Sequence, residues 1–172
     1  MDEKIESRYD FLKQTLTVDA SHNEKSQEIG IGIVIQETGL SGKRGAIIEM
    51  LSETFLYAKV TPKDMELFAI VRAFEIAFER NYRYIQIRSD YNYVKKQVAA
   101  TLRNRTSPTI NNFYDQILKL AEPLKQIRMT YYPRRKNIMA HRLARKGAGI
   151  FPKAKNMPEP EYWLYEEISD LQ

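Results

Sequence analysis

The sequence predicts an α/β fold: a mixed five-stranded sheet, with three antiparallel strands followed by two parallel ones, flanked by helices. Apolar residues alternate with a period of two through the first third of the chain, and a period near 3.6 starts after Thr61. From there strands and helices alternate, which is typical of parallel crossovers. With 172 residues, 43% of them hydrophobic, the chain can bury one ordinary core. It contains no cysteine, which excludes disulfides, a thiol nucleophile and cysteine-ligated zinc.

The first three predicted strands span residues 16–21, 29–36 and 54–60. In the second strand, isoleucines at alternate positions share one face, while Gly30 and Gly32 lie on the other. Short connections between three successive strands predict an antiparallel meander.

Helix signals follow the meander. Thr61 is a suitable N-cap and Pro62 is accepted in a first helical turn, so a helix of about four turns is predicted to begin here. The remaining elements are predicted, in order, as a strand at 84–88, a helix at 91–102, a helix starting at Ser107-Pro108, a strand at 127–132, and a last helix capped by Asn137 and stopped by Gly147.

The composition divides the chain into three parts. Residues 1–14 form a charged N-terminal extension, residues 15–148 the folded domain, and residues 149–172 an acidic, aromatic-containing C-terminal tail. Three placements of the tail remain open: a disordered segment, a cover over the basic face of the domain, or a segment docked on an apolar edge or a protein partner. The N-terminus lacks the apolar core of a signal peptide and no stretch approaches about 20 apolar residues, so we expect a cytoplasmic protein without membrane contact.

Positive charge is concentrated in one part of the chain. Residues 95–146 contain 13 Lys and Arg and two acids, a net charge of +11, against +5 for the whole chain. This excess indicates either a solvated basic face or a surface that binds the phosphate backbone of a nucleic acid. Composition alone does not decide between them.

Four polar residues lie where an α/β sheet places its ligand sites. Asp19 ends the first predicted strand and Asp90 follows the fourth. Glu66 lies one turn into the first long helix, and His141 lies one turn into the last. Each of them alone has an ordinary role, as a turn former, a first-turn acid or a surface histidine.

Together with their neighbours, these residues resemble the type-1 ribonuclease H family, in its shorter branch without the basic handle helix. The resemblance covers residues 15–147 and depends on four motifs that follow one another in order: LTVDAS followed by an Ile-Gly-Ile-Gly strand, Met65-Glu66-Leu67 after a Thr-Pro start, Ile87-Arg88-Ser89-Asp90-x-x-Tyr93-Val94, and Asn137-x-x-Ala140-His141-x-Leu143-Ala144. It implies a ribonuclease H-like fold and a metal-dependent endonuclease that hydrolyses the RNA strand of RNA–DNA hybrids by a two-metal mechanism.

The same resemblance implies the site residues. Asp19, Glu66 and Asp90 are the expected catalytic residues and metal ligands for two divalent ions, Mg²⁺ or Mn²⁺. His141 stands where the family usually has a fourth aspartate, and as a catalytic metal ligand its imidazole suits Mn²⁺ better than Mg²⁺. The expected nucleic-acid contacts lie in the loop before the last helix: Arg134, Arg135, Lys136 and Asn137.

Two other functions remain open at this point. One is a catalytically silent module of the same fold that binds nucleic acid or a protein partner. The other is a nuclease of the same superfamily that acts on a different nucleic-acid substrate. A silent module should show no metal-dependent cleavage, which distinguishes it from an enzyme. A nuclease with another substrate is distinguished by assaying several nucleic acids in parallel.

Overall fold

A computed structural model describes residues 13–38, 44–57, 60–106 and 112–150 of the chain. Most of the predicted N-terminal extension and of the acidic tail lie outside these residues, as does the predicted helix start at Ser107-Pro108. No helix within the described ranges combines the length and the apolar character needed to cross a membrane.

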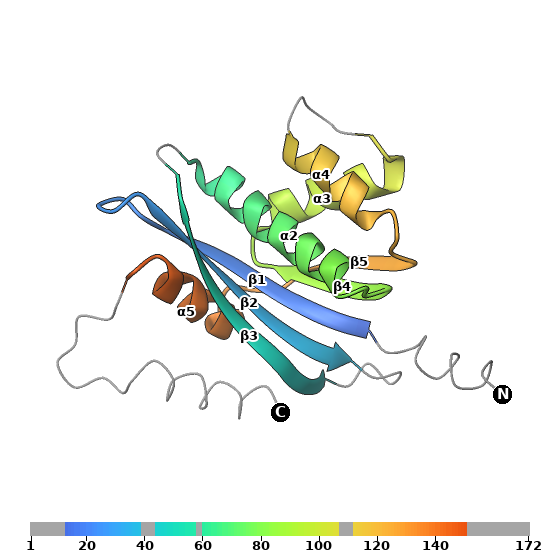
Figure 1. Ribbon diagram of the computed structural model, residues 1–172, viewed down its shortest axis with the longest axis horizontal. Helices are drawn as coiled ribbons and strands as arrows, with labels where there is room; N and C mark the ends of the chain where they lie inside the picture. Colours follow the sequence, from blue (N-terminus) through green and yellow to red (C-terminus); the bar gives the residue numbers. More distant parts are fainter. Residues whose placement is uncertain (1–12, 39–43, 58–59, 107–111, 151–172) are drawn as a thin grey trace.

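Five strands form one mixed sheet in the order β3-β2-β1-β4-β5. The strands are β1 (Lys13–Asn23), β2 (Glu28–Thr38), β3 (Arg44–Leu56), β4 (Tyr84–Ser89) and β5 (Gln126–Tyr131). The β1–β2 and β2–β3 pairs are antiparallel, whereas β4 pairs in parallel with both β1 and β5 (Figure 1). The predicted fold class, with three antiparallel strands followed by two parallel ones, is confirmed.

The third strand is longer than predicted. It begins at Arg44, whereas the sequence pattern placed its start at Thr54. Its register against β2 shifts at the step from Ile35 to Gln36, where Ile48 is an extra residue on β3. This bulge exchanges the faces on which even and odd residues lie: Ile47 packs in the smaller core under α5, whereas Leu51 and Phe55 pack against the main core on the other face.

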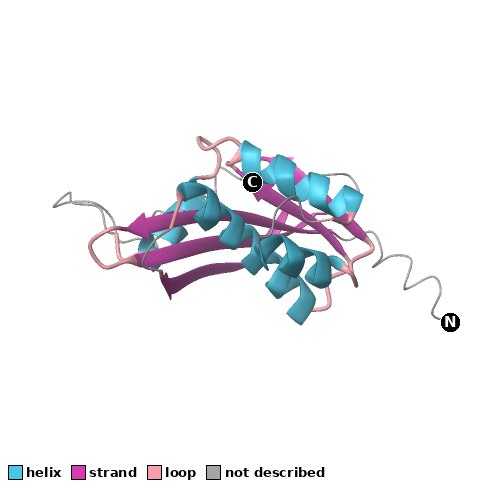
Figure 2. Cartoon of the chain, turned by 90° about the horizontal axis from the view of Figure 1, so that it is seen from above, coloured by secondary structure: helices cyan, strands magenta, loops and turns pink. Residues whose placement is uncertain are grey.

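Helices cover both faces of the sheet. They are α2 (Pro62–Glu79), α3 (Asn92–Asn104), α4 (Asn112–Ala121) and α5 (Ile138–Gly147). Figure 1 shows α2, α3 and α4 on one side of the sheet and α5 on the other, and Figure 2 shows from above how the strands lie side by side along the molecule. The predicted start of α2 is confirmed, because the Asp64 N–H donates to Thr61 Oγ1 at 3.1 Å and Pro62 opens the helix.

The main core lies between the sheet and the layer of α2, α3 and α4. The alternating isoleucines of β2 are buried there against helix residues that include Leu67, Phe74 and Ile117. A smaller core under α5 contains Val34 and Leu143. The central strands are therefore buried on both faces.

Gly30 and Gly32 allow α5 to lie directly on β2. A Cβ atom on Gly32 would lie 2.0 Å from the Ala140 carbonyl oxygen, and one on Gly30 would lie 1.8 Å from that of Ala144. Both contacts are with the helix backbone, which has no rotamer through which to move away. The two glycines therefore determine how closely α5 approaches the sheet.

The last helix ends at Gly147, as predicted, but the turn that ends it is made by Gly149. Gly149 is in the left-handed region with φ of 69°, and the Ile150 N–H donates to the Arg145 carbonyl at 2.9 Å. Gly147 is required by packing instead, because a Cβ atom there would lie 2.4 Å from the Glu53 carbonyl oxygen.

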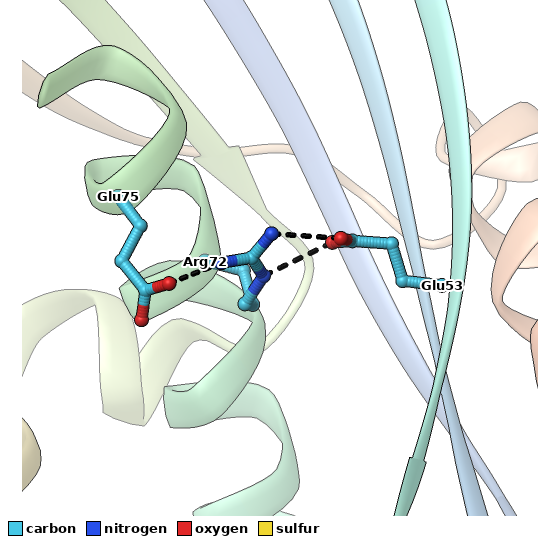
Figure 3. Close-up of polar contacts among 3 residues, drawn as sticks. All are labelled: Glu53, Arg72 and Glu75. Carbon is cyan, nitrogen blue, oxygen red and sulfur yellow. Dashed lines mark hydrogen bonds and ion pairs between the residues drawn. The ribbon is translucent and has the colours of Figure 1, made fainter. Parts of the chain in front are cut away.

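Charged side chains connect the edge strand β3 to α2 (Figure 3). The Nε and Nη2 atoms of Arg72 donate to the two carboxylate oxygens of Glu53 at 3.1 and 2.7 Å, and Nη1 donates to Glu75. A second ion pair joins Arg80, the residue that directly follows α2, to Glu49 of β3. β3 is the outermost strand and forms backbone hydrogen bonds with β2 alone. The ion pairs to α2 and Arg80 therefore add to its attachment to the sheet.

Candidate metal centre

Three carboxylates converge where β1 extends beyond β4. The parallel ladder between these strands ends with the pair of Thr17 and Arg88, so Asp19 lies past the end of β4 and Asp90 directly follows it. Glu66 reaches the same point from the beginning of α2. One oxygen atom of each of the three carboxylates lies within 4.8 Å of the others. The structure therefore brings together three of the four residues expected to bind metal.

The three carboxylates repel one another in the protein alone. Burial raises the pKa of Glu66 well above its ordinary range, and the charges of Asp19 and Asp90 raise it further. Burial, followed by the charge of Asp19, raises the pKa of Asp90 to about 6, although Arg134 and His141 oppose this shift. The Glu66 Oε2 atom is buried without a hydrogen-bond partner among the described residues. A cation would relieve both the repulsion and the unpaired oxygen.

The donor set fits hard divalent cations. All three converging groups are carboxylates, two of them buried and one half-buried. Mg²⁺ and Mn²⁺ prefer oxygen ligands, and Mg²⁺ keeps several of its water molecules when only a few carboxylates bind it. The cluster can therefore hold such ions and leave coordination positions for water and substrate.

His141 lies beside the cluster and is not one of the three converging groups. It projects from the first turn of α5, and its Nδ1 atom lies 2.7 Å from Asp19 Oδ2. An imidazole N–H that donates to a carboxylate holds that carboxylate in one orientation and leaves the other ring nitrogen for a further partner. The sequence placed His141 at the site, but its pairing with Asp19 is visible only in the structure.

Asn137 binds the backbone of β1 on the side where β4 no longer pairs with it. Its Nδ2 atom donates to the Val18 carbonyl oxygen at 3.0 Å, and only 1% of the residue is exposed. The Ala20 N–H is hydrogen-bonded to Glu66. Because β4 ends before this point, these two side chains satisfy backbone groups that a neighbouring strand would otherwise bind.

The structure bears on two predictions about Asn137, its place at the start of α5 and its contact with nucleic acid. Asn137 directly precedes Ile138, the first residue of α5, and its carbonyl oxygen accepts from the His141 N–H at 3.2 Å, so the predicted N-cap position is confirmed, although its side chain makes no capping hydrogen bond. A side chain buried to this extent also has no free surface for the expected nucleic-acid contact. The Asn137 Nδ2 atom is occupied because the last helix packs against β1, whereas the Oδ1 atom is buried without a hydrogen-bond partner among the described residues. A local sequence pattern contains neither fact.

The other three expected nucleic-acid contacts lie in an exposed turn between β5 and α5. Arg134, Arg135 and Lys136 are all exposed, and the Lys136 N–H closes the turn on the Pro133 carbonyl at 2.8 Å. The charge of Arg134 lowers the pKa of Asp90 against the larger raising effects. The turn therefore borders the carboxylate cluster.

The structure also pairs a cation with an aromatic ring, a contact that the sequence did not indicate although Tyr93 belongs to one of the four motifs. Lys63 Nζ lies 4.7 Å from the centroid of the Tyr93 ring. The two residues belong to different helices, so no periodicity within one helix indicates their contact.

A mixed sheet in this strand order, with one aspartate in β1 where it extends past β4 and another directly after the parallel strand β4, defines a ribonuclease H-like protein. A family model described as "Reverse transcriptase-like" matches residues 17–147. The chain belongs to this family, which agrees with the resemblance to ribonuclease H in the sequence motifs. No curated protein matches the sequence significantly.

Solved structures share the fold at low sequence identity. RNase H1 from the halophilic archaeon Halobacterium salinarum NRC-1 has a TM-score of 0.64 at 20% identity, covering 80% of this chain and 98% of the other. LC11-RNase H1, solved in complex with an RNA/DNA hybrid, has a TM-score of 0.62 at 19% identity, covering 80% and 97%. The N-terminal RNase H domain of a Mycobacterium tuberculosis protein, solved as a fusion with maltose-binding protein, has a TM-score of 0.62 at 17% identity, covering 80% and 94%. At these identities the likeness establishes the fold.

Proposed function

We propose that this protein is a metal-dependent endonuclease that hydrolyses the RNA strand of RNA–DNA hybrids. The main support for the proposal is the convergence of Asp19, Glu66 and Asp90 at the end of β4, where β1 extends past it. Membership of the family supports a ribonuclease H-like nuclease. LC11-RNase H1, which has the same fold, is solved with an RNA/DNA hybrid, and this supports a hybrid as the substrate.

Each residue of the site has a proposed role. Two divalent ions, Mg²⁺ or Mn²⁺, supply an activated water and stabilise the leaving oxygen when they are bound. Asp19, Glu66 and Asp90 hold these ions. His141 orients Asp19 through Nδ1, which leaves Nε2 as a candidate ligand for the second ion. The exposed turn of residues 134–136 binds substrate phosphates next to the cluster.

A cleavage assay with parallel substrates tests the proposal. The full chain is incubated with an RNA–DNA hybrid, duplex DNA and branched DNA, first with Mg²⁺ and then with Mn²⁺. We expect cleavage of the RNA strand of the hybrid alone. Cleavage of another substrate assigns a different nuclease activity, and no cleavage in either metal assigns a silent binding module.

Neutralising the turn is expected to weaken substrate binding. In a variant with Arg134→Ala, Arg135→Ala and Lys136→Ala, each lost phosphate contact should reduce the slope of log affinity against log salt by about one unit. The rate at saturating substrate should change less, because these side chains hold the backbone and do not carry the metal.

Fluorescence anisotropy with a labelled hybrid, titrated at several salt concentrations, measures this slope. The matched control removes three exposed cations from the far end of the sheet, where α3 and α4 lead toward the beginning of β5: Arg103, Lys119 and Lys125. An equal change in slope for both triple variants would show that only total charge matters.

Replacing His141 with Asp is expected to change the metal preference. An oxygen ligand suits Mg²⁺ better than imidazole does, so the ratio of the Mg²⁺ rate to the Mn²⁺ rate should rise by about tenfold. Rates at saturating concentrations of each metal give the ratio. His141→Asn, which supplies a neutral side chain of the same size as Asp, should not reproduce the rise in this ratio.

A further inference from the structure

An apolar pocket lies where the first turns of α2 and α4 meet the start of β2 and the end of β3. Its walls are aliphatic and aromatic side chains: Ile29, Tyr57, Val60, Met65, Phe68 and Phe113. The one charged side chain that the described residues add to these walls is Asp64, and its carboxylate already accepts from Thr61 Oγ1 at 2.9 Å. The pocket therefore suits an apolar group.

Three aromatic rings of the pocket are in contact with one another. The ring centroid of Phe68 lies 5.8 Å from that of Tyr57 and 5.8 Å from that of Phe113. The cavity measures about 110 Å³, which is of the same order as a cavity of about 150 Å³ that binds benzene. One more aromatic ring therefore fits the pocket in size, and tilted contacts with the three rings would stabilise it.

The mouth of the pocket exposes apolar surface to solvent. Tyr57 is 41% exposed, and its neighbour Leu56, the last residue of β3, is 75% exposed. Two adjacent large apolar side chains in solvent, beside an apolar pocket, indicate a surface that is covered by another group.

The described part of the chain ends near this pocket, on the opposite face of the sheet. Asn23 Nδ2 donates to the Ala148 carbonyl oxygen at 3.0 Å, and a Cβ atom on Gly149 would lie 3.4 Å from Glu28 Oε2. Glu28 directly precedes Ile29, and successive side chains of a strand lie on opposite faces. A chain that continues from this point reaches the pocket by passing around the turn of residues 24–27.

The acidic tail carries an apolar group of suitable size. Its residues 162–165, which lie outside the described residues, read Tyr-Trp-Leu-Tyr, and Trp163 is the only tryptophan of the chain. Thirteen residues separate Trp163 from Ile150, so the tail can span at most about 43–47 Å. Burial of an indole ring removes a large apolar surface from water.

A second groove, between the ends of α3 and α4 and the start of β5, is the other candidate for the tail. Its charged side chains are three cations and one acid: Arg103, Arg105, Lys125 and Glu122. Its residue Ile127 is level with Gln14 of β1, which lies about 30 Å along the strand from Asn23. The tail would have to cross this length and also pass around the sheet, which requires almost full extension. The position of the chain end therefore favours the apolar pocket, although the charge of the groove suits an acidic segment.

We propose that the acidic tail folds back on its own domain and inserts Trp163 into the apolar pocket between α2 and α4. The indole ring packs against Tyr57, Phe68 and Phe113, and the neighbouring tail residues cover Leu56. The docked tail connects the first turns of both helices to the end of β3.

The fluorescence of Trp163 tests the proposal in the full chain, because no other tryptophan contributes. We expect its emission maximum at a shorter wavelength than in the chain unfolded by urea, and several-fold weaker quenching by acrylamide. Tyr57→Asp, which places a charge at the mouth of the pocket, should move both quantities toward the unfolded values. Phe78→Asp is the matched control, because Phe78 is 49% exposed near the end of α2 and does not line the pocket. It should leave both quantities unchanged.

Thermal melts give a second readout. Trp163→Ala should lower the melting temperature by about 3–6 °C, and Trp163→Phe, which keeps a ring, should lower it less. Trp163→Ala combined with Tyr57→Asp should lower it by less than the sum of the two single effects, because both remove the same contact. If Tyr57→Asp fails to fold, the two Trp163 variants still decide the proposal.

Four results would overturn the proposal. The first is emission of the wild type that matches the unfolded chain, and the second is a melting temperature that is unaffected by Trp163→Ala. The third is an emission that ignores Tyr57→Asp but responds when the cations of the second groove are removed by Arg103→Ala, Arg105→Ala and Lys125→Ala, which would place the tail there. The fourth is an emission maximum that depends on protein concentration, which would show that the tail binds a second copy of the chain.

Discussion

Asp19→Asn and Asp90→Asn are each expected to reduce hybrid cleavage on the order of 10³-fold or more, yet to leave the metal-free fold at least as stable as the wild type. The loss of activity follows because each substitution removes a charged ligand from the cluster of three carboxylates. The gain in stability follows because these charges raise the pKa of Glu66, which reports their mutual repulsion. Activity assays and thermal melts in EDTA measure the two effects.

The stability effect of Asp90→Asn is expected to depend on pH. In the folded protein the pKa of Asp90 is raised from an ordinary value of 3.8 to about 6, so the folded state binds the proton more tightly than the unfolded chain. This carboxyl therefore stabilises the fold fully below about pH 4, and that contribution is lost as the pH rises through 6. Asn does not ionise, so the difference in melting temperature between variant and wild type should be largest above pH 7 and small near pH 4.

The matched control for both aspartates is Asp115→Asn, which removes an exposed carboxylate of α4 outside the cluster. It should leave both cleavage and metal-free stability close to the wild type. A melting temperature that falls in Asp19→Asn and Asp90→Asn at pH 7 would assign these carboxylates a structural role. A stability difference that is the same at pH 4 and pH 8 would show that repulsion is not its cause.

Gly32→Ala is expected to produce the largest loss of stability, about 3–5 kcal/mol or more, which is a large part of the stability of an ordinary domain. The added Cβ atom would lie 2.0 Å from the Ala140 carbonyl oxygen and 2.6 Å from the Ala144 nitrogen. Both are backbone atoms, so α5 as a whole must move away from β2. Urea unfolding monitored by circular dichroism measures the loss.

The matched control deletes volume on the same strand. Val34→Ala shortens a side chain that packs under α5, and it should cost about 1.5–2.5 kcal/mol without displacing the helix. Adding one methyl group at position 32 should therefore destabilise more than removing two at position 34. The folded fraction of Gly32→Ala should also cleave poorly, because α5 carries His141 to Asp19. Stability of Gly32→Ala within 1 kcal/mol of the wild type would contradict the close approach of α5.

Much of the architecture was predictable from local patterns. Thr61 and Pro62 predict the start of α2, and the alternating isoleucines of β2 predict the face of the sheet that packs in the main core. The first half of the third strand was missed, because Glu49 and Glu53 occupy partly buried positions where an alternating pattern would have apolar residues, and they pair there with Arg80 and Arg72.

The sequence by itself determined which residue types are available for chemistry and on which helices and strands they lie. Helices and strands are recognised by caps and periodicities, and these depend on only a few neighbouring residues. Asp19, Glu66 and Asp90 were placed on their elements in this way, their role as metal ligands was implied by the resemblance to ribonuclease H, and the structure brings them together. Only the tertiary structure decided that His141 binds Asp19, that Asn137 is buried against Val18, and how closely α5 approaches the two glycines of β2. These contacts join residues more than 100 positions apart, so they depend on how complete elements pack against one another, and no local pattern in the chain records that geometry.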